Sequence, residues 1–305
     1  MSVNASVTRF AAKIGRVPEL PEVESVARQL APKLTGRRIV DVWWDDHPAA
    51  RISDLARATD TYAHQVIRRG KFLLVPLTPH AETSGPPGDP IAPDAAAAPI
   101  ELVLHLGMTG SFTFEPTGVE KVSHVRARLF LDNATTLAFR DPRRFGRASV
   151  VDRGAYHGVI PTLATLGPEP LSENFDARGF AAALAATRAP IKAVLLGQKV
   201  VAGVGNIYAD EALWRSKIHP GSRRVGAARA ALLRECVIDV LTESIEREGT
   251  TFRDYQLVNG SSGSNLPFLD AYGRAGKPCR RCRSRLHSTV IAGRTTIYCR
   301  RCQRA

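Results

Sequence analysis

The stretch Pro18-Glu19-Leu20-Pro21-Glu22-Val23-Glu24 stands at the start of the first regular element of the chain. Pro21 suits the first turn of a helix because it has no N–H group to leave unpaired, and Glu22 and Glu24 lie favourably near the positive end of the helix dipole. The apolar residues around and after them recur at helical spacing: Val23, Val26, Ala27, Leu30 and Leu34. The stretch therefore predicts a helix that buries one face against a core and ends at Gly36.

Pro18 lies just outside this helix. As the first residue of a chain it would carry a free secondary amine, a nucleophile able to form an iminium with a sugar carbon. Within the chain as written its nitrogen is an amide and inert. Taken alone, the stretch fits a proline-marked helix start better than a catalytic site.

Composition narrows the class of protein. A length of 305 residues indicates two domains with proper apolar cores. The formal charge of +13 and the pI near 10.0 indicate a polyanionic partner, which charge alone leaves open between nucleic acid and an anionic membrane surface. The sequence has no apolar run of about 18 residues, so we expect no membrane-spanning helix.

Four of the five cysteines form two CxxC pairs that are separated by sixteen residues: Cys279, Cys282, Cys299 and Cys302. Four thiolates at this spacing predict one structural Zn²⁺ in a reducing cytosol, with a two-stranded hairpin between the pairs. Arginines crowd the same module, and they suit phosphate contacts or groove insertion, although a solvated basic face is the alternative.

Short runs of β-branched and aromatic residues predict several strands, which with one opening helix imply a β-sandwich or barrel. These runs are 38–44, 62–66, 72–77, 100–106, 125–131 and 135–139, the last two joined by a turn at Asp132-Asn133. The Pro-, Gly- and Ala-rich segment 82–99 reads as a loop between two neighbouring strands.

Helical patterns follow at 177–187, 191–196, 205–216 and 226–247. We therefore expect an α+β protein with an N-terminal β-sandwich domain at 18–152, a linker at 153–170, a helical domain at 171–268 and a zinc module at 269–305. Residues 1–17 are basic and lack acids, so they read either as a transit peptide or as a misassigned start in a GC-rich gene whose true initiator is Val17. In both cases this leader would be absent from the mature protein.

Several loops offer chemistry that local sequence leaves open. In Asp141-Pro142-Arg143-Arg144-Phe145-Gly146, the ring of Phe145 is either a core anchor or a wedge that enters a base stack beside Arg143. Met108 could fill the core or plug a loop tip, and Lys71 could reach a phosphate or be solvated. Two glycines lead into a helix near Asn206, where free N–H groups would suit a phosphate.

Together these residues resemble the formamidopyrimidine-DNA glycosylase family of bacterial base-excision repair enzymes, which has endonuclease VIII relatives. The resemblance covers residues 18–305, and its motifs occur in family order: Pro18 to Glu24, Arg69-Gly70-Lys71, His105-Leu106-Gly107-Met108, Asp141 to Gly146, Leu166 to Leu171, Gly203 to Leu213 and the cysteine module. The family fold is an N-terminal β-sandwich, a helix-two-turn-helix domain and a zinc-finger hairpin, with DNA in the cleft between the main domains.

The resemblance implies a catalytic set of Pro18, Glu19 and Lys71. The Pro18 amine would attack C1′ of a damaged nucleotide, Glu19 would move protons, and β- and δ-elimination would cut both flanking phosphodiesters without a catalytic metal or organic cofactor. By the same resemblance, four residues would contact phosphates of damaged double-stranded DNA around an everted nucleotide: Lys71, Lys192, Asn206 and Arg294. Three others would fill the gap that this nucleotide leaves in the base stack: Met108, Arg143 and Phe145. The segment 258–265 corresponds to the loop that closes over the damaged base.

Leu20 in the opening motif favours the branch that acts on oxidised purines such as 8-oxoguanine and formamidopyrimidines. The alternatives are an endonuclease VIII-like enzyme for oxidised pyrimidines, or a damaged-DNA-binding protein without catalysis if the leader is retained. By the same resemblance we expect a cytoplasmic bacterial monomer that binds DNA and no membrane.

Overall fold

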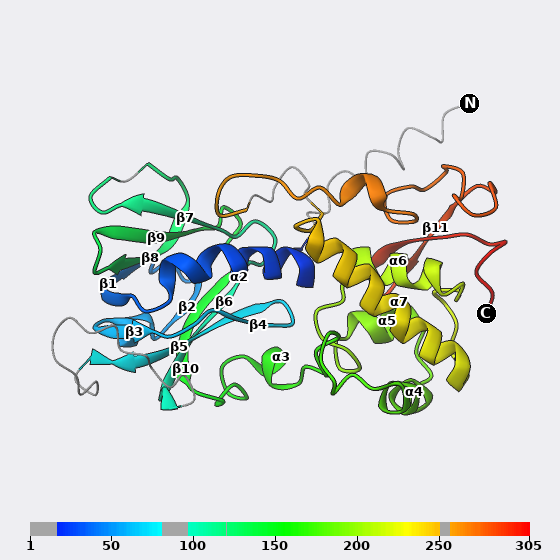
Figure 1. Ribbon diagram of the computed structural model, residues 1–305, viewed down its shortest axis with the longest axis horizontal. Helices are drawn as coiled ribbons and strands as arrows, with labels where there is room; N and C mark the ends of the chain where they lie inside the picture. Colours follow the sequence, from blue (N-terminus) through cyan, green and yellow to red (C-terminus); the bar gives the residue numbers. More distant parts are fainter. Residues whose placement is uncertain (1–16, 81–96, 120, 251–256) are drawn as a thin grey trace.

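The computed structural model describes residues 17–80, 97–119, 121–250 and 257–305. The expected leader, apart from Val17, and most of the expected loop at 82–99 lie outside these residues. A sheet occupies one end of the molecule and helices with a small hairpin occupy the other, as Figure 1 shows. None of the helices in the described parts of the chain has the length and apolar character that a bilayer span requires.

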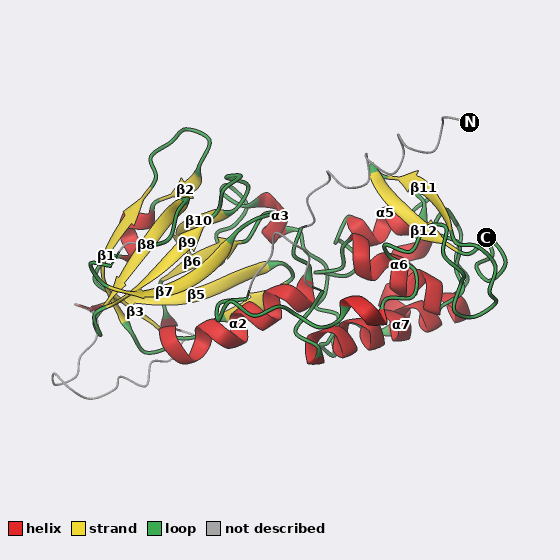
Figure 2. Cartoon of the chain, turned by 90° about the horizontal axis from the view of Figure 1, so that it is seen from above, coloured by secondary structure: helices red, strands yellow, loops and turns green. Residues whose placement is uncertain are grey.

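The opening helix, α2 (Leu20–Leu34), confirms the prediction from the first motif. Glu19 is its N-cap and forms a capping box with Glu22, and Gly36 follows the C-cap residue with a φ of +75°. The two ends of α2 pack in different cores. Leu20 belongs to the core of the helical half, whereas the apolar residues from Val23 onward belong to the core of the sheet. The helix therefore bridges the two halves of the protein (Figure 2).

The strands of the N-terminal half form one large sheet. In chain order they are β1 (Arg38–Trp44), β2 (Arg51–Ser53), β3 (Thr61–Ala63), β4 (Ile67–Arg69), β5 (Phe72–Pro79), β6 (Ile100–His105), β7 (Ser111–Pro116), β8 (Val125–Leu131), β9 (Thr135–Arg140) and β10 (Arg147–Asp152). Their order across the sheet is β2-β10-β6-β5-β3-β1-β8-β9-β7, with β4 paired to β5. A short 3₁₀ helix, η1 (Leu55–Ala58), follows β2.

The sheet folds over so that its two halves face each other across one core. Leu102 and Leu104 of β6 share this core with Leu129 of β8 and Leu137 of β9, and register shifts interrupt the pairing of β1 with β8 and of β8 with β9. Such irregularities bend strands, which suits a sheet that closes on itself. The expected β-sandwich is confirmed, and β5 and β6 are neighbours as expected of the strands joined through 82–99.

Four strands were absent from the sequence prediction: β2, β4, β7 and β10. Two of them, β2 and β4, have only three residues, too few for an alternating pattern to stand out. The helical half contains α3 (Pro161–Ala164), α4 (Ala177–Ala185), α5 (Ile191–Leu196), α6 (Asn206–Arg215) and α7 (Ala227–Glu246), which matches the four expected helices and adds α3. The domain boundaries stay a prediction.

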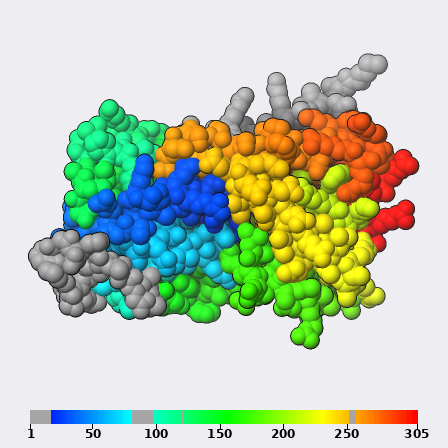
Figure 3. Space-filling model, in the orientation of Figure 1, coloured from blue at the N-terminus to red at the C-terminus, as the bar shows by residue number. Residues whose placement is uncertain are grey.

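After α7 the chain returns to the sheet before it reaches the zinc module. Leu257 packs in the sheet core, and the backbone N–H of Asn259 donates to the side chain of Gln29 on α2. The chain then runs through η4 (Leu266–Phe268) to the expected hairpin of β11 (His287–Ile291) and β12 (Arg294–Tyr298). Figure 3 shows α2 directly against α7, with this orange segment lying over their junction.

Candidate active site and nucleic-acid interface

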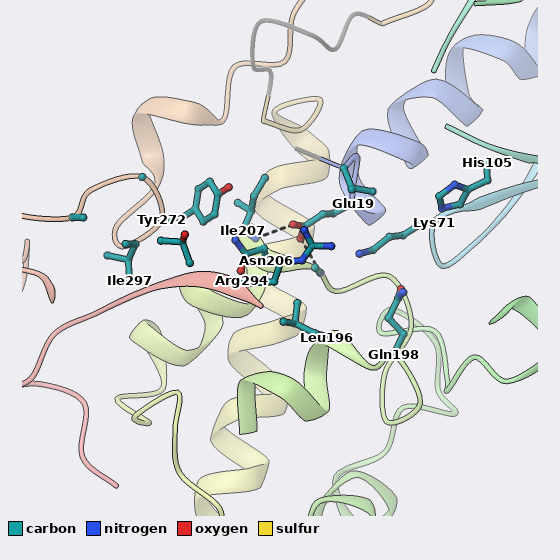
Figure 4. Close-up of a pocket in the computed structure, with 15 residues that line it drawn as sticks. Glu19, Lys71, His105, Leu196, Gln198, Asn206, Ile207, Tyr272, Arg294 and Ile297 are labelled. Atoms are coloured by element: carbon teal, nitrogen blue, oxygen red, sulfur yellow. Dashed lines mark hydrogen bonds between the residues drawn. The ribbon is translucent and has the colours of Figure 1, made fainter. Parts of the chain in front are cut away.

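A cavity of about 440 Å³ opens where the sheet, the helices and the zinc module meet. Its wall includes Val17 and Glu19 at the start of α2, Lys71 at the turn before β5, Asn206 at the start of α6 and Arg294 at the start of β12. Figure 4 shows Lys71 entering from the side of the sheet, and Asn206 and Arg294 from the opposite side. Residues from four separate segments of the chain therefore share one pocket.

Glu19 is the most firmly held of these side chains. Its buried carboxylate accepts hydrogen bonds from the backbone N–H groups of Gly205 and Ile207, both at 2.8 Å, and of Tyr208 at 3.3 Å. Burial raises the pKa of Glu19, while Lys71 and these N–H groups oppose the rise. A Cβ at position 205 would lie 2.3 Å from the Glu19 carboxyl carbon, so the close contact requires a glycine.

The expected phosphate site on free N–H groups at this helix start is therefore wrong for those three groups. They bind the carboxylate of Glu19 because α2 brings it to the positive end of α6. The side chain of Asn206 lies half-buried at the pocket wall, and its Oδ1 atom has no hydrogen-bond partner.

Glu22 lies next to Glu19 and binds its backbone N–H group. Its buried carboxylate accepts hydrogen bonds from the Tyr208 hydroxyl at 2.5 Å, the Thr250 N–H at 2.6 Å and the Glu19 N–H at 2.9 Å. Burial, followed by the nearby charge of Glu19, raises the pKa of Glu22 to about 7. Sequence reasoning treated Glu22 only as a partner of the helix dipole. The available signal was a second glutamate three positions after the first, the spacing of a capping box.

Lys71 faces this pair of glutamates from the turn between β4 and β5. Burial lowers the pKa of Lys71, whereas Glu19 and Glu22 oppose the change. The turn itself is held by Glu169, whose carboxylate accepts hydrogen bonds from the Gly70 N–H at 2.6 Å and from Arg69 at 2.9 Å. Glu169 lies in the Leu166 to Leu171 motif, but sequence reasoning assigned it no role of its own.

Pro18 is buried and is followed directly by Glu19. Val17, which is bonded to the Pro18 nitrogen, is itself part of the pocket wall. Pro18 thus lies in the chain between two residues that line the pocket, Val17 and Glu19.

The loops that carry Met108, Arg143 and Phe145 pack against each other. Gly107, with a φ of +61°, approaches the backbone of Phe145 so closely that a Cβ there would lie 2.5 Å from the carbonyl carbon. The Phe145 side chain is 42% exposed, which contradicts a core anchor, and the Arg143 guanidinium lies 4.9 Å from the centre of its ring. An exposed ring under a guanidinium is a geometry that suits stacking with a base.

Lys192 takes a different position from the one expected. Its ammonium is fully buried and lies 2.6 Å from Asp210 of α6 and 2.9 Å from the Thr296 hydroxyl of β12. Burial lowers the pKa of Lys192, and Asp210 opposes this. The expected contact of Lys192 with a DNA phosphate is not supported by this geometry, because solvent does not reach the ammonium. Arg294, by contrast, is exposed at the pocket.

The four expected zinc ligands come together in the hairpin module. The sulfur atoms of Cys279, Cys282, Cys299 and Cys302 all lie within 4.8 Å of one another. A tetrahedral site with Zn–S bonds of about 2.3 Å needs sulfur atoms about 3.8 Å apart, so this set fits a structural Zn²⁺. The Trp214 Nε1–H of α6 donates to the Cys279 sulfur at 3.4 Å, which connects the metal site to the helical half.

Three family models match successive parts of the chain. They are the formamidopyrimidine-DNA glycosylase N-terminal domain at residues 17–148, the formamidopyrimidine-DNA glycosylase H2TH domain at residues 166–256, and a zinc finger found in FPG and IleRS at residues 276–305.

Known proteins resemble the chain over nearly its whole length. The formamidopyrimidine-DNA glycosylase of Herpetosiphon aurantiacus is 40% identical over 94% of this chain and 100% of its own. The crystal structure of the MutM (FPG) protein from Thermus thermophilus superposes with a TM-score of 0.80, with 41% identity over 94% of this chain and 98% of that one. A Lactococcus lactis FPG mutant in complex with Fapy-dG-containing DNA gives a TM-score of 0.79 and 29% identity, covering 94% and 100% of the two chains.

Proposed function

The chain belongs to the formamidopyrimidine-DNA glycosylase family, and from this premise we propose that it excises oxidised purines and then cuts the DNA strand as an AP lyase. The observation that carries the proposal is the Glu19 carboxylate, which the N–H groups of Gly205 and Ile207 hold at the wall of a pocket that Lys71 also lines. Pro18 directly precedes Glu19 in the chain. A fixed carboxylate next to an amine is the arrangement that covalent catalysis at a sugar carbon needs.

The first step would be attack of a free Pro18 amine on C1′ of the damaged nucleotide. A bond forms between the proline nitrogen and C1′ as the bond from C1′ to the base breaks, and the base leaves with a proton. Opening of the sugar ring then gives an iminium. The raised pKa of Glu19 favours its protonated form more than usual for a glutamate, which suits donation of a proton to the sugar and its later recovery.

The second step would be elimination. The iminium withdraws electrons and acidifies the proton on C2′, so a base can remove it and the C3′–O bond to the phosphate breaks. A further elimination releases the phosphate on the 5′ side. In this scheme the zinc ion holds the finger module and takes no part in the chemistry.

The same pocket would hold DNA around an everted nucleotide. Lys71, Asn206 and Arg294 are proposed to bind phosphates, because each presents a hydrogen-bond donor at the pocket wall. Met108, Arg143 and Phe145 are proposed to fill the vacated stack, in agreement with the exposure of the Phe145 ring. The segment 258–265 would close over the base, and a monomer suffices for this reaction.

Oxidised purines are the proposed substrates. Leu20 in the opening motif supports this choice, as does the resemblance to a Lactococcus lactis protein whose complex contains Fapy-dG DNA. An oxidised-pyrimidine enzyme is the second candidate within the family.

The nucleophile requires a chain that begins at Pro18. We propose that residues 1–17 are absent from the mature protein, either because translation starts at Val17 and this residue is removed, or because the leader is cleaved. Mass spectrometry of the protein from its own host tests this directly.

The decisive experiment is borohydride trapping with two matched proteins, one that begins at Pro18 and one that begins at Met1. Only the first has a proline amine, and we expect it alone to become covalently linked to 8-oxoguanine duplex DNA. A Glu19→Gln variant of the first protein should bind the duplex but cut it much more slowly. Absence of trapping for the chain that begins at Pro18 would overturn the lyase mechanism. Faster cleavage of thymine glycol than of 8-oxoguanine would favour the second candidate.

A further inference from the structure

Three basic side chains lie in a row across neighbouring strands next to the active-site pocket. Arg51 of β2 is paired with Arg147 of β10, and Arg147 is paired with His105 of β6. Side chains at paired positions project from the same face of a sheet, here the face opposite Leu104 and Ala148, which belong to the sheet core. Figure 2 shows these three strands side by side. The row therefore lies on the outer face of the sheet.

The two arginines have no partner of opposite charge in the part of the chain that the structure describes. Among the described residues no carboxylate forms an ion pair with either guanidinium, and the one polar contact is from Arg147 to the Ser149 hydroxyl at 3.5 Å. Other arginines of this half of the protein do have partners: Arg57 of η1 pairs with Asp152, and Arg126 of β8 pairs with Asp45.

Two like charges at directly paired positions destabilise a sheet. Burial, followed by the charge of Arg51, lowers the pKa of Arg147, in agreement with this repulsion. Arg51 is exposed and Arg147 is half-buried, so an anion from outside can reach both. The pair is thus suited to bind a doubly hydrogen-bonded anion such as a phosphate.

The row leads into the active site. His105 lies at the pocket wall with Lys71, and its ring packs against Phe72 with 4.7 Å between ring centres. Arg147 is paired with His105 on one side and with Arg51 on the other, so the row extends from the pocket wall to β2. Strands are about 4.8 Å apart, which places Arg51 roughly 10 Å from His105 at the pocket wall. A DNA backbone that passes the pocket could therefore reach both arginines within a few nucleotides.

We propose that Arg51 and Arg147 form a second phosphate site, which binds the DNA backbone within a few nucleotides of the everted nucleotide. The proposal rests on the proposed binding of DNA at the pocket, and it extends that interface along the outer face of β10 and β2. The site would contribute affinity that is independent of the base sequence, and it would help to orient the strand that enters the pocket.

Binding measurements on a duplex with a tetrahydrofuran abasic analogue test this site, because such binding needs no reactive proline. We expect Arg51→Gln and Arg147→Gln each to weaken binding about three- to tenfold at low salt. Each should also lower the slope of log Kd against log salt concentration by about 1, and the double variant should lower it by about 2. Arg57→Gln is the matched control, since Arg57 already pairs with Asp152, and its slope should equal that of the parent.

Neutral methylphosphonate linkages locate the contact. In a series of duplexes, each with a single such linkage at a different position within a few nucleotides of the analogue, one position should weaken binding of the parent protein but not of the double variant. The lysine variants Arg51→Lys and Arg147→Lys should recover most of the salt slope, which separates loss of charge from misfolding. An unchanged slope in folded glutamine variants, or equal sensitivity of parent and double variant to the neutral linkage, would overturn the proposal. These binding measurements do not need a reactive proline, so they can be interpreted even if borohydride trapping fails. The two proposals can therefore be rejected independently of each other.

Discussion

The Thr109 hydroxyl donates a hydrogen bond to the Asp141 carboxylate, with 2.5 Å between the oxygen atoms. This contact joins the loop that carries Met108 to the loop that carries Arg143 and Phe145. The other oxygen of the buried carboxylate accepts the Gly146 N–H at 2.6 Å, so one side chain ties both loops together. The three side chains proposed to enter the base stack are therefore mounted on a single unit.

Loss of the Asp141 hydrogen bonds should reduce the preference for damaged over undamaged duplexes more than it reduces the affinity for DNA in general. We expect Asp141→Asn to lower the free energy of unfolding by about 1–3 kcal/mol, because a buried donor at Gly146 loses a charged acceptor. The ratio of affinities for damaged and undamaged duplexes should fall as well. Thr109→Ser keeps the hydroxyl and serves as control for Thr109→Val. Equal loss of affinity for both duplexes would contradict a role in presenting the wedge residues.

The second prediction concerns the Lys192–Asp210 pair. A buried ion pair affects the free energy of unfolding, whereas a phosphate contact affects the salt dependence of DNA binding. Lys192→Met should destabilise the protein by about 3–5 kcal/mol, because it leaves the Asp210 carboxylate buried without its cation. Replacing both residues with apolar ones should recover part of this loss. Urea unfolding measures the effect. A stable Lys192→Met variant with a lower salt slope of DNA binding would instead support the phosphate contact expected from the family resemblance.

The zinc affinity of the hairpin module should depend on Trp214 as well as on the four cysteines. Cys279→Ser should abolish stoichiometric zinc, measured by metal analysis, and weaken DNA binding. Trp214→Phe removes the N–H donor to the Cys279 sulfur and should lower zinc affinity about tenfold. Trp43→Phe is the control, because Trp43 lies exposed on β1. Identical zinc affinities for the two tryptophan variants would rule out this role for Trp214.

His105 should remain neutral well below the pH at which a free histidine gains a proton. Burial, followed by the charges of Lys71, Arg147 and Arg51, lowers the pKa of His105 to about 4. Between about pH 6.5 and 4 the unfolded chain binds a proton at this position that the folded chain does not. The contribution of His105 to stability is therefore complete above about pH 6.5 and declines by about 3 kcal/mol as the pH falls to about 4.

A His105→Gln variant should lack this part of the acid destabilisation, which the pH dependence of urea unfolding measures. NMR titration of the imidazole should show a higher pKa in Arg147→Gln than in the parent, because one like charge is removed. A parent His105 that titrates near the ordinary value of about 6.5 would contradict the prediction.

The sequence alone was sufficient to predict the zinc ligands, the opening helix, the main strands and the family. These features depend on local spacing: two CxxC pairs, an apolar period of about 3.6 residues, and motifs that are continuous in the chain. The family resemblance implied catalytic roles for Pro18 and Glu19, although it did not indicate which donors hold the Glu19 carboxylate.

The folded chain supplies the contacts between distant segments. Glu19 occupies the N–H groups of Gly205 and Ile207, and Lys192 is buried against Asp210 rather than exposed to DNA. Arg51 and Arg147 become neighbours only because β2 and β10 pair in the sheet. Each of these outcomes depends on which segments the two cores bring together and on which charges lose their water in the process, and neither follows from residue spacing.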